Sequence, residues 1–130
     1  SGNPEAATGQ GSGSLVMAHE IRTALFAAVP LLILDEDRSA TNLLVPGCLQ
    51  GDGVMPLATL LATRREALGE TALLFAASSL DILIAQADRI LVLSGHEAHA
   101  IDPREFRRRL DRHLAEMREH LARREGGGPP

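Results

Sequence analysis

Apolar residues follow two kinds of spacing along the chain, and the two kinds alternate. Short continuous apolar runs are typical of strands that are covered on both faces, as in a parallel sheet. These runs lie at 31–34, 71–77 and 89–93. A fourth strand is expected at 97–101, after the turn at Ser94-Gly95. Helices are predicted between them from helical periodicity, Pro start signals and Gly stop signals, at 14–29, 56–68 and 80–85. The alternation predicts an α/β fold built in layers.

A further helix is predicted near the carboxyl end of the chain. Asp102 at the N-cap, Pro103 at the first helical position and Glu105 at the third position form a typical helix start. Apolar side chains then recur every three or four residues, at Phe106, Leu110, Leu114, Met117 and Leu121. This amphipathic stripe is expected to dock on the sheet or on a helix of a partner, and the pattern leaves both options open.

The same patterns predict how the chain is organised. Residues 1–11 are small and polar and predict a flexible segment, while the Gly/Pro-rich residues 126–130 predict a disordered tail. Between them we expect an α/β unit at 12–101 and the amphipathic helix at 102–125.

Composition excludes several classes of function. A net charge of -4 and an aromatic content of 2% argue against nucleic acid as a partner. One cysteine excludes a disulfide framework, and no stretch reaches the roughly 20 apolar residues of a membrane span, so we expect a cytoplasmic protein. The arginine run at 107–109 alternates with acidic residues, which favours a solvated, salt-bridged face with Glu105–Arg109 and Glu119–Arg123 pairs. The chain contains no lysine, so it cannot complete a phosphate-binding P-loop.

Two short motifs are candidates for chemistry. Asp35-Glu36-Asp37 follows a buried strand, where Asp35 could orient Mg²⁺ and Glu36 could polarise an attacking water; the alternative is a strand that simply ends in a charged turn. Gly11-Ser12-Gly13-Ser14 precedes a predicted helix and could bind a phosphate-sized anion; the alternative is a linker.

Taken together with the segments that follow, these motifs resemble the second half of an ABC-type ATPase domain. Leu32-Ile33-Leu34-Asp35-Glu36 resembles the Walker B strand with its catalytic glutamate, and 39–42 (Ser-Ala-Thr-Asn) resembles the D-loop. Residues 87–95 resemble the Ala-Asp-Arg-Ile strand of the family and its Gly turn. The string from Asp35 to Asn42 is closest to the branch called predicted ATPase of the ABC class.

The resemblance assigns a role to each matching residue. Asp35 would hold Mg²⁺ and Glu36 would act on the hydrolytic water, while Ser39 to Asn42 would couple two sites. Ser12, Gly13 and Ser14 stand in the signature that contacts nucleotide, although Gly13-Ser14-Leu15 replaces Gly-Gly-Gln. The family's switch histidine falls on Ser78, so Ser79 or Asp81 is the expected γ-phosphate sensor.

The resemblance also implies an incomplete site. It predicts a partial P-loop NTPase-like layered fold, with a mostly parallel sheet, a terminal hairpin and a long C-terminal helix. ATP and Mg²⁺ would bind only when a Walker A-containing half or a second subunit, such as the other chain of a homodimer, supplies the phosphate cradle. We therefore expect the isolated chain to be inactive. The alternative function is a non-catalytic interaction module that dimerises through its C-terminal helix.

Overall fold

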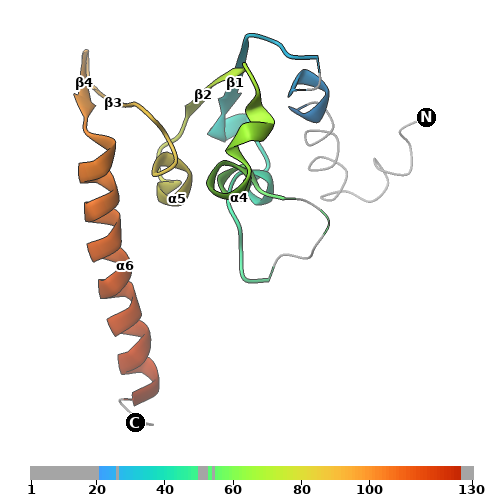
Figure 1. Ribbon diagram of the computed structural model, residues 1–130. Helices are drawn as coiled ribbons and strands as arrows, with labels where there is room; N and C mark the ends of the chain where they lie inside the picture. The colour runs from blue at the N-terminus through green and yellow to red at the C-terminus, as the bar shows by residue number, and fades with distance from the viewer. Residues whose placement is uncertain (1–20, 26, 50–52, 54, 127–130) are drawn as a thin grey trace. The chain divides into compact units, whose positions relative to one another are not determined.

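A computed structural model describes residues 21–25, 27–49, 53 and 55–126. The chain divides between Gln86 and Ala87 into two compact units. Figure 1 shows the elements of each unit along the chain. Within the described ranges, no helix is both long enough and apolar enough to cross a membrane.

The first unit is built on two parallel strands. β1 (Leu31–Asp35) pairs with β2 (Ala72–Ala76) in a register that places Leu31 opposite Ala72 and Asp35 opposite Ala76. The start of β2 is held by the backbone before β1: the buried Thr71 hydroxyl donates to the Val29 carbonyl at 2.6 Å. A parallel pair needs a long crossover. Here the crossover contains η1 (Glu36–Arg38), α3 (Thr41–Leu44), α4 (Leu57–Thr63) and η2 (Arg65–Leu68), and α5 (Asp81–Ile84) follows β2.

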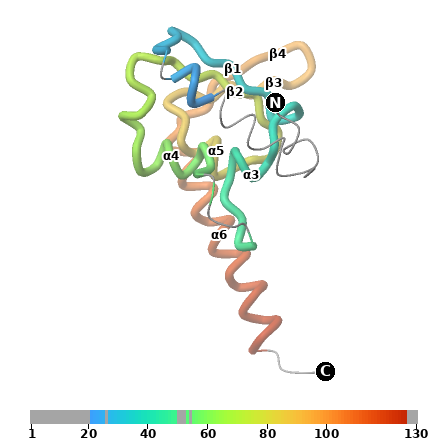
Figure 2. Tube along the Cα trace, turned by 90° about the vertical axis from the view of Figure 1, so that its right-hand side faces the viewer, coloured from blue at the N-terminus to red at the C-terminus, as the bar shows by residue number. Residues whose placement is uncertain are grey.

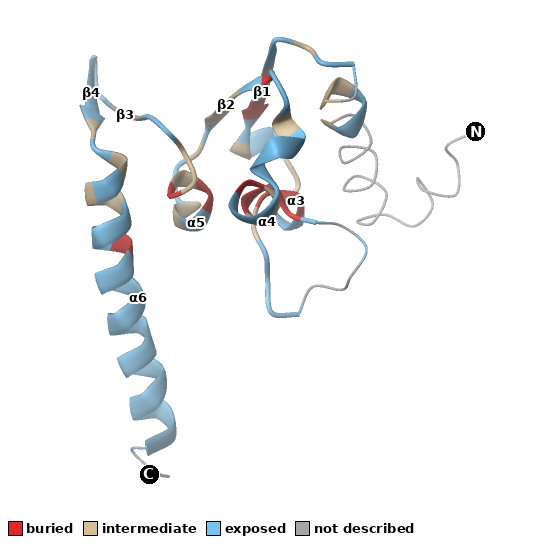
Figure 3. Cartoon of the chain, viewed as in Figure 1, coloured by how far each residue is buried: buried red, intermediate tan, exposed pale blue. Residues whose placement is uncertain are grey.

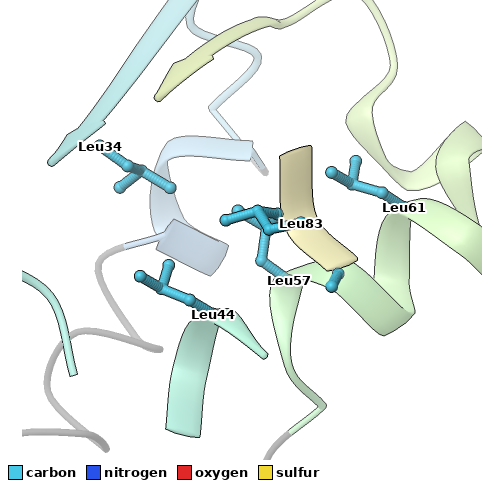
Figure 4. Close-up of a cluster of buried hydrophobic side chains, with 6 residues drawn as sticks. Leu34, Leu44, Leu57, Leu61 and Leu83 are labelled. Atoms are coloured by element: carbon cyan, nitrogen blue, oxygen red, sulfur yellow. The ribbon is translucent and has the colours of Figure 1, made fainter. Parts of the chain in front are cut away.

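The crossover helices and α5 build the core against one face of this sheet. Figure 4 shows leucine side chains from β1, α3, α4 and α5 pointing toward one another. The cluster consists of Leu34, Leu44, Leu57, Ala58, Leu61 and Leu83. Leu32, Leu73 and Phe75 pack against it as partly buried residues. Figure 3 shows that most of the buried residues lie in this first unit.

The opposite face of the sheet is open. Leu31 and Ile33 in β1 are 50% and 64% exposed, and Leu74 in β2 is 57% exposed. The prediction that these strands are covered on both faces is therefore wrong for the described residues. The continuous apolar runs identified a parallel pair correctly, but the core packs on one side only.

The second unit contains a hairpin and a long helix. β3 (Ile90–Ser94) pairs antiparallel with β4 (Glu97–Ile101), and Gly95 enters the turn with a φ of 61°. A positive φ at the first turn residue favours glycine and suits the twist of a hairpin. α6 (Pro103–Gly126) follows, and Figure 2 traces it as one continuous helix.

The α/β class, the parallel pair, the terminal hairpin and the long helix are confirmed. The described sheets are two separate pairs, however, and β3 pairs only with β4. The predicted helix at 56–68 breaks at Arg64, between α4 and η2. Of the helix predicted at 14–29, residues 21–25 are helical, and residues 14–20 lie outside the described residues. Segment 1–11 and residues 127–130 also lie outside them, and Gly126 ends α6.

The turn before β1 contains a strained alanine. Two hydrogen bonds close it: Ala28 N–H donates to the Leu25 carbonyl at 3.0 Å, and Val29 N–H donates to the Ala24 carbonyl at 3.3 Å. This is the Schellman pattern at a helix end, whose left-handed residue is usually glycine. Ala28 occupies that position with a φ of 57°. Its Cβ makes this conformation unfavourable by roughly 1 kcal/mol.

Replacing Ala28 with glycine should therefore stabilise the first unit. We expect Ala28→Gly to raise the free energy of unfolding by about 1 kcal/mol, measured by urea denaturation. The matched control is Ala62→Gly, which places the same substitution in the right-handed backbone of α4 and should destabilise by about 0.5–1 kcal/mol. Equal destabilisation by both variants would contradict the strain at Ala28.

The start of α6 is held by two ion pairs. The carboxylate of Asp102 accepts the Arg104 backbone N–H at 2.9 Å and lies 3.2 Å from the Arg104 guanidinium, and Glu105 accepts a hydrogen bond from Arg108 at 2.9 Å. The hydrogen bond from the Arg104 side chain lowers the pKa of Asp102, and that from Arg108 lowers the pKa of Glu105. Glu119 pairs with Arg123 at 3.9 Å as predicted. Glu105, for which Arg109 was the predicted partner, pairs with Arg108 instead.

These lowered pKa values predict an acid-sensitive helix start. A carboxylate with a lower pKa in the folded state stabilises that state fully above its unfolded value, and the effect disappears as the pH falls through the folded value. We expect the backbone NMR shifts of residues 103–106 to remain helical down to pH ~4 and to move toward coil values below it. Asp102→Asn should reduce this change. A transition centred near neutral pH would contradict the assignment to these two carboxylates.

Candidate functional site

The candidate site lies where the two parallel strands end. Because β1 and β2 are parallel and in register, their carboxyl ends meet at the same edge of the sheet, with Asp35 opposite Ala76. Ligands of open α/β sheets bind outside the carboxyl ends of the strands. The residues that directly follow β1 and β2 are therefore the first to consider.

The turn after β1 is fixed by its own polar groups. Asp35 ends the strand in an extended conformation, and its Oδ1 accepts the Asp37 backbone N–H at 3.1 Å, which caps η1. The Ser39 hydroxyl donates to the Asp35 carbonyl at 2.6 Å. Asp35 remains exposed, while Glu36 and Ser39 are half-buried. The turn therefore holds Asp35 in place and leaves it accessible to a ligand.

Glu36 joins the ends of the two strands. Its Oε1 accepts the backbone N–H of Ser78, the second residue after β2, at 2.6 Å, and lies 3.4 Å from the Ser78 hydroxyl. A hydrogen bond from a backbone N–H to a carboxylate is charge-assisted and stronger than one between neutral groups. The two residues are 42 positions apart in the sequence, so this bond crosses between segments that only the sheet brings together.

The structure gives the other predicted residues the following positions. Asn42 lies in α3 and is exposed. Ser79 is exposed in the bend after β2, and Asp81 is half-buried in the first turn of α5. Ser12, Gly13 and Ser14 lie outside the described residues.

Ser78 is a residue of this edge that the sequence does not single out. The resemblance places the family's switch histidine at Ser78 and leads to Ser79 and Asp81 as the expected sensors. The backbone N–H of Ser78 makes the hydrogen bond, so the residue type at this position does not predict it. The position of Ser78 directly after β2, at the same edge as Glu36, does predict that the two residues lie close together.

The donor set at this edge suits magnesium. Mg²⁺ prefers oxygen ligands and, with a nucleotide, takes one or two carboxylates besides phosphate oxygens and water. Asp35 is an exposed carboxylate at the expected point, and the Ser39 hydroxyl is hydrogen-bonded beside it. The described part of the chain holds no cluster of three or more His, Cys, Asp or Glu side chains fit for a metal. A metal carried by a nucleotide needs one or two protein carboxylates, and Asp35 is suited to be one of them.

Comparison with known proteins covers nearly the whole chain. A family model described as ABC_ATPase, P-loop domain, matches residues 2–125. The chain is 41% identical over 118 residues to Uncharacterized protein MJ1628 of Methanocaldococcus jannaschii, a match that covers 89% of this chain and 26% of that protein. The chain thus spans about a quarter of the length of the curated relative it matches. No solved structure matches at a significant level.

The Glu36–Ser78 hydrogen bond can be tested directly by amide exchange. We expect Glu36→Ala to raise the hydrogen-exchange rate of the Ser78 amide roughly tenfold, because a bond to a charged acceptor contributes about 1.5 kcal/mol or more. The measurement is residue-resolved NMR exchange on the 130-residue chain. Asp37→Ala, which removes the neighbouring exposed carboxylate, is the control and should leave Ser78 unchanged. Similar exchange at Ser78 in both variants would contradict the described geometry.

Proposed function

The chain belongs to the ABC_ATPase P-loop domain family, and from this membership we propose that it supplies the Walker B and signature side of a composite ATP-hydrolysing site. The membership confirms the resemblance to an ABC-class ATPase that Asp35-Glu36 and residues 39–42 indicated. The observation that carries the proposal is the hydrogen bond from the Ser78 backbone to Glu36, beside the exposed Asp35 at the ends of the parallel strands.

Asp35 is the residue assigned to the metal. When bound, Mg²⁺ neutralises charge on the phosphate oxygens of ATP. Asp35 is suited to this position because the Asp37 N–H and the Ser39 hydroxyl fix its backbone and one carboxylate oxygen. A ligand held by a rigid turn needs no rearrangement when the nucleotide arrives, which favours binding.

Glu36 is the residue assigned to the attacking water. The Ser78 amide engages Oε1, and we assign the other oxygen of the same carboxylate, Oε2, to accept a proton from the water. An oriented carboxylate in this role accelerates a reaction by about 10²–10⁴-fold. The Ser78 N–H fixes the orientation of the Glu36 carboxylate. The proposed base is therefore positioned by a backbone donor and needs no side chain for this purpose.

The residues after β2 complete this side of the site. Ser79 and Asp81 follow the amide that contacts Glu36, and we keep them as candidate sensors of the γ-phosphate. Ser39 to Asn42 continue from the turn that holds Asp35, which supports their assignment to coupling between two sites. Ser12, Gly13 and Ser14 are proposed as the nucleotide-contacting signature.

The phosphate cradle must come from elsewhere. The P-loop of this family uses a lysine, and this chain has none. The relative it matches is about four times longer than the matched part, so a Walker A-containing half or a second subunit is the proposed partner. We accordingly propose that ATP and Mg²⁺ are used only in the completed site and that this chain alone is inactive.

The proposal predicts a defined pattern of phosphate release. The chain alone should release no phosphate from Mg-ATP above the buffer rate. Fused to a Walker A-containing half of an ABC-type ATPase domain, it should hydrolyse ATP, and Glu36→Gln in that fusion should lower kcat about 10²–10⁴-fold while ATP binding persists. Steady-state phosphate release and binding of a fluorescent ATP analogue measure the two effects.

Asp37→Asn in the same fusion is the matched control, since it removes the adjacent exposed carboxylate, and its kcat should stay within about twofold of the unchanged protein. Full activity in the Glu36→Gln fusion would exclude Glu36 as the base. Turnover by the isolated chain that Glu36→Gln abolishes would show that no external cradle is needed.

A further inference from the structure

α6 presents an apolar stripe, most of which is exposed among the described residues. Leu114, Met117 and Leu121 are 47%, 41% and 63% exposed, and every residue from 111 to 126 is exposed. Leu110, at the start of the stripe, is buried. Isolated apolar residues on a surface are ordinary, but three on one helical face form a surface that water solvates poorly.

The spacing of the stripe is that of a paired helix. From Leu110 the apolar residues follow at intervals of four, three and four residues, which is the heptad spacing of a coiled-coil seam. In an antiparallel pair, Leu114 of one helix packs beside Met117 of the other, and Leu121 beside Leu110. The three exposed residues of each stripe, Leu114, Met117 and Leu121, then lie within this contact, and Leu110 is already buried.

Charges next to the seam agree with this antiparallel register. In this register, Asp111 would lie beside Arg118 of the second copy, and Arg104 would lie beside Glu125 of the second copy. Twofold symmetry repeats each pair, which gives four contacts between opposite charges. Opposite charges at flanking positions set partner and orientation in coiled coils. Arg104 already pairs with Asp102 in its own chain, so its contact with Glu125 would extend that pair.

A parallel arrangement lacks this complementarity. Its flanking pairs would be Phe106 with Asp111, His113 with Arg118, and His120 with Glu125, of which only the last can be attractive. The next layer beyond the antiparallel seam would oppose Arg107 and Arg124, so the apolar contact ends after four layers. The seam is therefore short and has one register.

We propose that α6 binds α6 of a second copy of this chain, antiparallel, with Leu114 packed against Met117 of the second copy. The partner is a second copy because the pattern of charges on this helix complements itself. The proposal does not depend on ATP hydrolysis, and either can fail without the other.

Sedimentation velocity on the 130-residue chain without nucleotide tests the proposal. We expect a concentration-dependent dimer, and Leu114→Glu with Met117→Glu should raise its dissociation constant more than tenfold. Ala115→Glu with Ala122→Glu adds the same charge on the outer face of α6 and should leave the constant within about threefold. A monomer at every concentration, or a dimer that both double variants leave intact, would overturn the proposal.

Charge reversal tests the register. Asp111→Arg should weaken the dimer several-fold, because it places two positive charges side by side. Adding Arg118→Asp should restore the dimer, because the charges at positions 111 and 118 are then swapped and again opposite in sign. Loss of the dimer in the double variant, with circular dichroism unchanged, would contradict the antiparallel register.

Disulfide trapping provides a second test of the register in chains that carry Cys48→Ser. A mixture of Leu110→Cys and Leu121→Cys chains should form the disulfide between unlike variants. Two Leu121→Cys chains should not cross-link, because their Cα atoms would lie 11 residues apart along the helix, about 16 Å. Cross-linking only between like variants would show a parallel pair.

Discussion

The parallel register of β1 and β2 is the constraint on which the candidate site depends. Asp35 lies opposite Ala76, so the residues that follow the two strands meet at one edge of the sheet. A shift of one residue would turn the apolar side chains of a strand to its other face. The buried hydroxyl of Thr71, bound to the Val29 carbonyl, and the backbone bond from Ala72 to Pro30 hold the start of the pair. The distance from Glu36 to Ser78 thus follows from packing at the opposite end of the strands.

Local patterns predicted the elements well where they depend on neighbours in the sequence. The three apolar runs and the segment after the Ser94-Gly95 turn form strands, and Asp102 and Pro103 start α6 as expected, because caps and turns use nearby groups. The break at Arg64 was not predictable from the Pro and Gly signals at the two ends of segment 56–68. The exposed face of β1 is not predicted for a different reason: a continuous apolar run is typical of a strand covered on both faces, whereas the described residues cover one face of this pair.

The sequence predicts candidate residues for this site but not their contacts. Asp35 and Glu36 are candidates because the run from β1 through Ser39 and its neighbours resembles the Walker B strand and D-loop of the ABC-type family, and their roles stay a prediction. The bond from Ser78 could not be found in this way, because a backbone N–H carries no residue identity. Its position could be inferred only from the fold, since the carboxyl ends of parallel neighbours share an edge.

The open face of the β1–β2 sheet has a consequence for handling the protein. Leu31, Ile33 and Leu74 present an apolar surface beside strand edges whose backbone groups are available for pairing, a combination that favours intermolecular sheet growth. Exposed apolar surface and unpaired strand edges of this kind make a folding chain prone to aggregation. The yield of soluble protein should therefore depend on what is co-expressed with this segment as much as on the segment's own stability.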